Sequence, residues 1–351
     1  MLKRISVSLF LGANLCTILL MWLCVALTFV SPDIIPRLSL LTLAFPVFLV
    51  VDLLFVIFWL LFKARLVWVP IAGALLIGGF VLDYSPMHLT VGSNTASNDS
   101  DISVITFNVG RMTEKEQRTE FMQFINTADA DIVCLQELDK RFLRNNKQWI
   151  DTTDYHTLQT GNVAILSRFP IISDTLHIDY PTRSNHCFAC WIDLRGDSVL
   201  LVNSHLESNH LSPEEKYEYT STIIDPNREA IRSSSRKLMG KLSEAASYRG
   251  KQADSICAFV MRNAQHPAIV CGDFNDTPVS YVYQRFARQF TSAYKKAGNG
   301  PGFTYSQRSF PVRIDHIFFS DDWECTSCSI DRSVSSSDHY PLIVRLSKKQ
   351  R

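Results

Sequence analysis

The sequence predicts an α/β domain of mixed β-sheets packed face to face with helices outside, preceded by an N-terminal bundle of three transmembrane helices. Residues 1–90 contain only five of the 35 Lys and Arg residues and three of the 34 Asp and Glu residues. Short apolar runs alternate with helical patterns over residues 102–347, and hairpins mix with crossovers. This uneven charge excludes a single soluble domain and a disordered chain.

Three nearly charge-free segments are predicted to cross a membrane, at residues 5–30, 38–62 and 66–82. At about 1.5 Å per residue, the first is longer than the roughly 30 Å hydrocarbon layer. Backbone polar groups need internal partners in lipid, so each should be a helix. A cleaved signal peptide has a shorter apolar region and does not fit a run followed by two more. Because the third segment is short, two spans with a surface segment is the alternative.

Basic residues near these segments predict their orientation. Lys3 and Arg4 precede the first span, and Lys63 and Arg65 separate the second from the third. Basic residues favour the cytoplasmic side. We therefore expect a cytoplasmic N-terminus in a bacterial inner (plasma) membrane, with residues 91–351 on the periplasmic or extracytoplasmic side. Asp52, inside the second span, is interpreted as a helix-paired or protonated acid rather than a functional site.

The rest of the chain is divided by composition. Residues 1–90 form the predicted transmembrane region, residues 91–101 a polar, flexible linker, and residues 102–347 the folded domain. Residues 207–235 are polar and aperiodic, which predicts an inserted loop near the chemistry. Strands are predicted at 102–108, 131–136, 162–167, 268–272, 312–320 and 342–347, a hairpin around 195–197, and helices at 114–128 and 228–263.

Amide, carboxylate and imidazole side chains occur where the apolar strands stop. One such residue is usually a cap or a turn residue. Six strand ends with this chemistry indicate instead that the side chains converge on one cleft. The strand ends carry Asn108, Glu137, His205, Asp273 with Asn275, Asp315, and Asp338 with His339.

This set resembles the endonuclease/exonuclease/phosphatase superfamily, which includes deoxyribonuclease I-like nucleases, apurinic-site endonucleases, neutral sphingomyelinases and inositol polyphosphate 5-phosphatases. The matching segments follow the family's order through the whole domain. The resemblance implies a four-layer α/β sandwich of two mixed sheets. The segments are TFNV (106–109), LQELD (135–139), GNVAILSRFPI (161–171), NSHLE (203–207), GDFND (272–276), RIDHIFFS (313–320) and SSDHYPLIV (336–344).

The resemblance also implies a metal site. Glu137 matches the glutamate that holds the catalytic divalent ion, and Asn108 and Asp338 match residues at or next to it. Oxygen ligands suit Mg²⁺, with Mn²⁺ as the other candidate. Some nucleases of the family carry an acid where this chain has Gly110. That difference disfavours an apurinic-site endonuclease.

Five further positions match catalytic residues of the family. His205 corresponds to the histidine that contacts the scissile phosphate, and Asp273 to the carboxylate that orients or deprotonates the attacking water. Asn275 matches the amide that holds Asp273 or the phosphate. His339 matches the catalytic histidine, oriented by Asp315. Either Asp273 or the His339–Asp315 pair could serve as the base.

The resulting expectation is a membrane-anchored, Mg²⁺-dependent phosphoesterase that hydrolyses phosphodiester or phosphomonoester bonds by in-line attack of water. Its substrate could be a nucleic acid, a phospholipid head group or a small phosphorylated molecule, and no obligate protein partner is evident. Residues 91–351 carry 30 basic residues (35 − 5) and 31 acidic ones (34 − 3), so they lack a bulk basic footprint for nucleic acid. The alternatives are a catalytically inactive, membrane-tethered binding module and a transporter or channel subunit.

Two Cys-x-x-Cys pairs, at 187–190 and 325–328, raise the alternatives of zinc binding, a disulfide or free thiols. In a strand, side chains three positions apart face opposite sides, so the first pair should not act as one clamp. His186 and His210 are expected at the surface, His316 as a packed histidine, and Arg168 in a structural pair.

Overall fold

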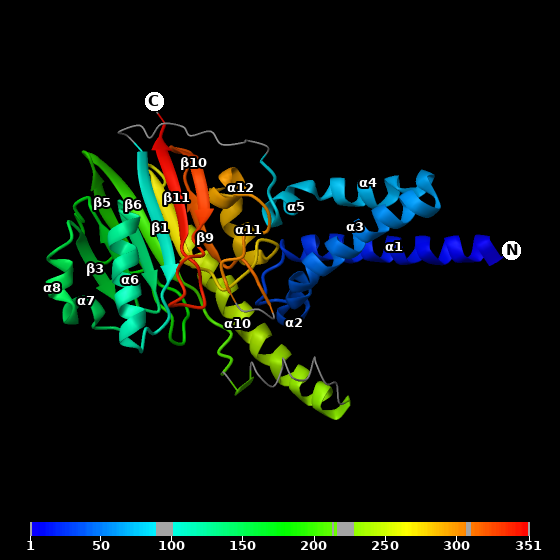
Figure 1. Cartoon of the computed structure of the whole chain (residues 1–351), viewed down its shortest axis with the longest axis horizontal. Coiled ribbons are helices and arrows are strands. Elements are labelled where there is room, and N and C mark those ends of the chain that lie inside the picture. The colour runs from blue at the N-terminus through cyan, green and yellow to red at the C-terminus, as the bar shows by residue number, and fades with distance from the viewer. Residues whose placement is uncertain (1, 89–100, 213, 216–227, 307–309, 350–351) are drawn as a thin grey trace.

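The computed structural model describes residues 2–88, 101–212, 214–215, 228–306 and 310–349. The N-terminal helices form an arm that extends from one side of a two-sheet sandwich (Figure 1). The predicted linker lies outside the described residues except for Asp101, which opens the first strand. Much of the predicted loop at 207–235, namely 213 and 216–227, also lies outside them.

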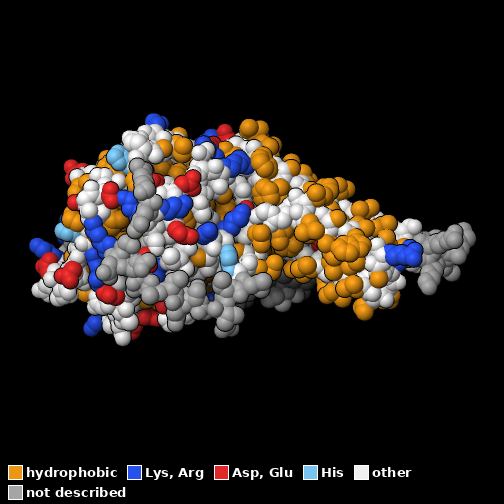
Figure 2. Space-filling model, turned by 90° about the horizontal axis from the view of Figure 1, so that it is seen from above, with side chains coloured by type: hydrophobic (Ala, Val, Ile, Leu, Met, Phe, Trp, Pro, Cys, Tyr) orange, Lys and Arg blue, Asp and Glu red, His pale blue; other side chains and the backbone are white. Residues whose placement is uncertain are grey.

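The arm contains two helices long and apolar enough to cross a membrane, Ser6–Leu27 and Pro36–Phe62. The predicted third span is a pair of helices bent by 73°, at a break where Gly78 and Gly79 follow Ile77. Apolar side chains cover the arm, whereas charged side chains gather on the sandwich (Figure 2). The elements are α1 (Leu2–Leu27), α2 (Pro36–Ser39), η1 (Leu40–Ala44), α3 (Phe45–Phe62), η2 (Ala64–Leu66), α4 (Trp68–Leu76) and α5 (Gly78–Tyr84).

Asp52 is buried and paired between helices, in agreement with its structural interpretation. Its Oδ1 accepts a hydrogen bond of 3.1 Å from Nδ2 of Asn14 on α1. The Oδ1 of Asn14 in turn accepts one of 3.0 Å from the indole of Trp59. This chain of partners satisfies polar groups that lipid could not, and it fixes α1 against α3.

The sandwich consists of one six-stranded and one five-stranded mixed sheet, with strand orders β10-β11-β1-β2-β4-β3 and β5-β6-β7-β9-β8. In each, a parallel pair, β1 with β2 or β6 with β7, is flanked by antiparallel neighbours. The strands are β1 (Asp101–Asn108), β2 (Ile132–Gln136), β3 (His156–Thr160), β4 (Val163–Ser167), β5 (Cys187–Leu194), β6 (Asp197–His205), β7 (Ala268–Asp273), β8 (Thr291–Ser292), β9 (Asp315–Phe319), β10 (Trp323–Ile330) and β11 (Leu342–Lys348).

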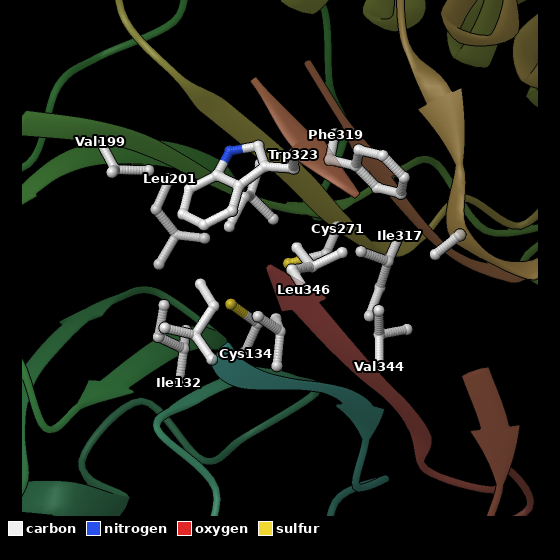
Figure 3. Close-up of a cluster of buried hydrophobic side chains, with 14 of the residues drawn as sticks. Ile132, Cys134, Val199, Leu201, Cys271, Ile317, Phe319, Trp323, Val344 and Leu346 are labelled. Atoms are coloured by element: carbon white, nitrogen blue, oxygen red, sulfur yellow. The ribbon is translucent and has the colours of Figure 1, made fainter. Parts of the chain in front are cut away.

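Three layers of apolar side chains hold the sandwich together. The central one lies between the sheets, where Cys134 of β2 and Cys271 of β7 occupy the middle of the cluster (Figure 3). Helices cover the outer faces, so four layers result, as the family resemblance implied. The helices are α6 (Lys115–Ala128), α7 (Phe142–Asn145) and α8 (Lys147–Ile150) on one side, and α10 (Arg228–Arg262) and α11 (Tyr281–Ala287) on the other, with α12 (Ala293–Ala297) beside β10.

All nine cysteines are free thiols in the structure. Cys187 faces the cluster beneath α10, whereas Cys190 faces the cluster between the sheets. The two side chains therefore point to opposite faces of β5, as the alternation of a strand requires. This arrangement excludes a zinc clamp at this pair.

The arm is joined to the sandwich by buried polar contacts at the end of α5. The carboxylate of Asp83 pairs with Nζ of Lys295 at 2.7 Å and accepts a hydrogen bond of 2.9 Å from Gln284. Arg313, only 2% exposed, donates to the backbone carbonyls of Asp83 and Tyr84. Because these partners come from the sandwich, arm and sandwich form one packed unit.

Candidate active site

Strand pairing brings the predicted site residues of the second sheet side by side. His205 pairs with Asp273 between β6 and β7, and Asp273 pairs with Asp315 between β7 and β9. Asn108 ends β1 in the facing sheet, next to Gln136 of β2. Each residue ends or begins a strand, so all of them lie at one edge of the sandwich.

Asp273 is the centre of the cluster and is buried. Its Oδ2 accepts hydrogen bonds of 2.9 Å from Nδ2 of Asn108 and 3.2 Å from Nδ2 of Asn275, and its Oδ1 accepts one of 2.8 Å from the backbone N–H of Asn275. The Nδ2 of Asn108 also donates to Glu137 at 3.2 Å. Asn108 therefore links the two carboxylates across the two sheets.

His339 lies between two buried carboxylates. Its Nδ1 is 2.8 Å from Oδ2 of Asp315, and its Nε2 is 3.9 Å from Oδ2 of Asp273. Burial lowers the pKa of His339, but the charges of Asp315 and Asp273 outweigh that effect and raise it to about 10. Burial raises the pKa of Asp273 above its ordinary value, against the opposing charge of His339. The imidazole of His339 is thus held in its charged form.

The Nε2 atom of His205 lies beside the carboxylates of Asp273 and Glu137. Its Nε2 lies 3.6 Å from Oδ2 of Asp273 and 3.7 Å from Oε1 of Glu137, and it has no hydrogen-bond partner in the described part of the chain. Burial lowers the pKa of His205, so the ring is neutral at pH 7. A buried, unpartnered ring nitrogen beside two carboxylates is costly unless a ligand satisfies it.

The backbone at these strand ends is strained. Glu137 and Asn275 have φ of 58° and 51°, in the left-handed region that costs a non-glycine residue about 1–2 kcal/mol. At Gly272, φ is 139°, and a Cβ atom would lie 1.8 Å from the carbonyl oxygen of Ser204. Only glycine fits there. Both side chains reach the cluster from these positions: Glu137 accepts a hydrogen bond from Asn108, and Asn275 donates one to Asp273.

Asp338 and His316 lie outside this cluster. The side chain of Asp338 is exposed, and its backbone carbonyl accepts hydrogen bonds from Ser306. His316 is buried behind β9, where its Nε2 lies 3.0 Å from the carbonyl of Asp276. His316 is therefore a packed histidine, as expected.

The other residues singled out in the sequence have structural contacts. Arg168 pairs with Asp129 and lies over the ring of Tyr155, in agreement with a structural role. His210 pairs with the buried Glu207. His186 is half-buried and contacts Asn162, rather than being fully exposed.

One residue that the sequence did not single out belongs to the site. The amide of Asn162, in the turn between β3 and β4, lies 3.4 Å from Nδ1 of His205 and 2.9 Å from Nδ1 of His186. It orients His205 from the side opposite Glu137 and Asp273. Asn162 lies in the GNVAILS segment that resembles the family. A single asparagine in a turn is, however, an ordinary turn residue, and nothing in the sequence around it distinguishes it as part of a site.

The donor set fits a hard divalent cation. Asp273, Asp315 and His339 have ligand atoms within 4.8 Å of one another. These atoms already take part in hydrogen bonds: His339 with Asp315, and Asp273 with Asn108 and Asn275. The carboxylate of Glu137 is 35% exposed and has Asn108 as its one hydrogen-bond donor among the described residues. Its remaining oxygen lone pairs suit Mg²⁺ or Mn²⁺.

Comparison with known proteins identifies the family of this chain. The model of the endonuclease/exonuclease/phosphatase family matches residues 105–255 and 258–339, well over half of the chain. The chain belongs to this family. A second model, a domain of unknown function (DUF8431), matches residues 7–84 of the arm. None of the curated proteins matches the chain.

Solved structures of the endonuclease/exonuclease/phosphatase family share its fold. The human nocturnin catalytic domain with bound sulfate is 17% identical, with a TM-score of 0.53 over 72% of this chain and 97% of that one. A family member from Bacteroides thetaiotaomicron is 19% identical, with a TM-score of 0.50 over 71% and 95%. ANGEL2, described as a 2′,3′-cyclic phosphatase, is 14% identical, with a TM-score of 0.52 over 70% and 95%. At these identities the likeness shows the fold alone.

Proposed function

We propose that this protein is a membrane-anchored, Mg²⁺-dependent phosphoesterase that hydrolyses phosphodiester or phosphomonoester bonds by in-line attack of water. The observation that carries the proposal is the set of buried groups around Oδ2 of Asp273. Two imidazole nitrogens, those of His205 and His339, lie 3.6 and 3.9 Å from that oxygen, and the first has no hydrogen-bond partner among the described residues. Such a set can hold a water and a phosphate together.

Each group has a separate role in this proposal. Asp273, fixed by Asn108 and Asn275, orients the attacking water and accepts its proton. His205 donates from Nε2 to a non-bridging phosphate oxygen. His339, kept charged and oriented by Asp315, stabilises the developing negative charge and donates a proton to the leaving oxygen.

The metal is proposed at Glu137, with Asn108 beside it and Asp338 at the rim. A divalent ion there supplies positive charge to the non-bridging oxygens. Mn²⁺ is expected to replace Mg²⁺, because both take oxygen ligands in octahedral geometry.

The proposed location is the outer face of a bacterial plasma membrane, with residues 1–90 in the bilayer, residues 91–101 as linker and residues 102–347 as the catalytic domain. Two observations support it: the apolar surface of the arm, and the basic residues at the end of the arm away from the sandwich. The substrate class is proposed as a nucleic acid, a phospholipid head group or a small phosphorylated molecule.

The test uses the full-length protein in detergent with bis-p-nitrophenyl phosphate and p-nitrophenyl phosphate. EDTA should abolish hydrolysis, and Mg²⁺ or Mn²⁺ should restore it. Glu137→Gln should lower turnover by at least about 100-fold. Glu116→Gln, an exposed acid on α6, is the matched control and should have no effect. Activity that resists EDTA, or an active Glu137→Gln, would contradict the proposal. A panel of DNA, RNA, sphingomyelin and inositol phosphates then separates the substrate classes.

A further inference from the structure

A groove of about 590 Å³ lies where the arm meets the sandwich, apart from the candidate active site. One wall is formed by residues 35–38, at the start of the apolar segment Pro36–Phe62. The other is formed by Ser243, Glu244 and Ser247 of α10. Figure 1 shows α2 beside α10 at this junction. Because one wall begins a predicted span and the other belongs to the sandwich, the groove opens at the boundary between bilayer and water.

Of the charged side chains described around the groove, Arg37 is free to bind an anion, because the nearby acids are already paired. Glu244 forms an ion pair with Arg183. Asp33 pairs with Lys251 at 2.7 Å and accepts a hydrogen bond of 2.9 Å from the hydroxyl of Ser247. Arg37 is exposed, and it has no hydrogen-bond or ion-pair partner within the described ranges. The two acids near the groove are thus neutralised, and its local charge is positive.

The same part of the arm exposes apolar side chains. Leu38, which lines the groove, is 48% exposed, and the neighbouring Ile34 is 73% exposed. An exposed guanidinium next to exposed aliphatic side chains matches a molecule with a phosphate at one end and hydrocarbon at the other. The volume lies within the roughly 300–1,000 Å³ of small-molecule sites.

We propose that this groove binds the head group of an anionic phospholipid from the leaflet on the side of the sandwich. Arg37 contacts the phosphate, and the acyl chains lie along Leu38 and Ile34. The proposal rests on the membrane insertion proposed above. A lipid seated here touches both α2 and α10, so it fastens the catalytic sandwich to the bilayer surface.

The experiment measures lipid retention by native mass spectrometry of the full-length protein in detergent, titrated with phosphatidylglycerol or phosphatidylcholine. Phosphatidylglycerol should bind more tightly. Arg37→Gln should weaken its binding about fivefold, the effect of losing one basic contact with an anionic lipid. The matched control is Arg65→Gln, an exposed arginine at the opposite end of the arm, which should leave this binding unchanged.

A second variant tests the groove itself. Ser243→Leu narrows it and keeps Arg37, so it should also weaken binding of phosphatidylglycerol. Equal losses for Arg37→Gln and Arg65→Gln would show general surface charge and overturn the proposal. So would equal binding of the two lipids, or unchanged binding in both groove variants. Carbonate extraction of membranes tests insertion separately, and all three variants should keep full hydrolysis, so failure here is distinguishable from failure of the proposed function.

Discussion

The Nδ1 atom of His339 lies 2.8 Å from Oδ2 of Asp315, and both side chains are buried. The contact joins the loop before β11 to the first residue of β9. The other carboxylate oxygen of Asp315 has no hydrogen-bond partner among the described residues. His339 is therefore the one side-chain partner of the Asp315 carboxylate among the described residues. The contact fixes the orientation of the His339 ring, so that its Nε2 faces Asp273.

The pair should act as one catalytic unit. Asp315→Asn or His339→Ala alone should lower kcat/KM almost as much as the double substitution, because cooperating groups are strongly non-additive. Asp315→Asn combined with His205→Ala should show little coupling, since His205 contacts Asp273 and Glu137 instead. The measurement is a double-mutant cycle on metal-saturated, full-length protein. Simple additivity in the first pair would refute the orienting role of Asp315.

Asn162 should act through His205. Asn162→Ala removes the contact at Nδ1 and should lower kcat about tenfold, the effect of losing roughly one hydrogen bond of 1–1.5 kcal/mol, with a smaller change in KM. His186→Ala is the matched control, because it loses the other contact of Asn162 and leaves His205 in place. The apparent Tm of both variants shows whether the fold is intact. Equal kcat in wild type and Asn162→Ala would exclude the positioning role.

His316 should make the protein less stable in acid. Burial lowers its pKa to about 3 in the folded state, against an ordinary value near 6.5. Below pH 6.5 the unfolded chain binds a proton that the folded chain does not, so stability falls as pH falls from 6.5 toward 3, by up to about 1.4 kcal/mol per unit. The apparent Tm of His316→Gln, measured from pH 7 to 4, should decline less steeply than that of wild type. Parallel curves would contradict this.

The contact of Arg313 with α5 should stabilise the whole chain. Arg313→Met leaves the carbonyls of Asp83 and Tyr84 without their donor and should lower the apparent Tm by about 5 °C. Arg345→Met, an exposed arginine on β11, is the control. A fragment that begins at residue 91 lacks the same contacts and should also be less stable than the full chain. An unchanged Tm in Arg313→Met would show that the contact contributes nothing.

The two ends of the arm should lie on opposite sides of the membrane. The connection between α3 and α4, with Lys63 and Arg65, lies at the end away from the sandwich, whereas α2 and the end of α5 lie beside it (Figure 1). In a bacterial host, alkaline phosphatase fused after residue 95 should be active and green fluorescent protein there should be dark. Fusions after residue 65 should give the opposite pattern. A bright fluorescent fusion at 95 would place the sandwich in the cytoplasm.

The sequence predicted the site where strand ends determine position. Asn108, His205, Asp273 and Asp315 occupy the first or last positions of buried strands, and strand pairing then fixes their neighbours. Asp338 was the exception: in the loop before β11, an isolated bridge pairs His339 with Tyr305, and Asp338 lies one position before that bridge. Its side chain is exposed, although its neighbour His339 is buried.

Other features depended on irregularities that periodicity does not encode. β10 was not predicted, because a bulge between Cys325 and Ser327 shifts its register. Its inward positions change from Cys325 to Cys328 and Ile330, which breaks the alternation that marks a strand. The third apolar segment was predicted as a span, with a surface segment as the alternative, and its apolar composition alone did not predict the 73° bend at the Gly78-Gly79 pair.

The contact between Arg313 and Asp83 also sets an order of events during synthesis. The two residues are 230 positions apart, and Asp83 is made first. At about 5–20 residues per second, roughly 10–50 s pass before Arg313 leaves the ribosome. For most of that time the end of α5 has none of its partners from the sandwich, because Gln284 and Lys295 are also made late, shortly before Arg313. The third apolar segment therefore reaches its final packed position only after nearly the whole sandwich has been made. The completion of the arm is thus a late step in the biogenesis of this protein.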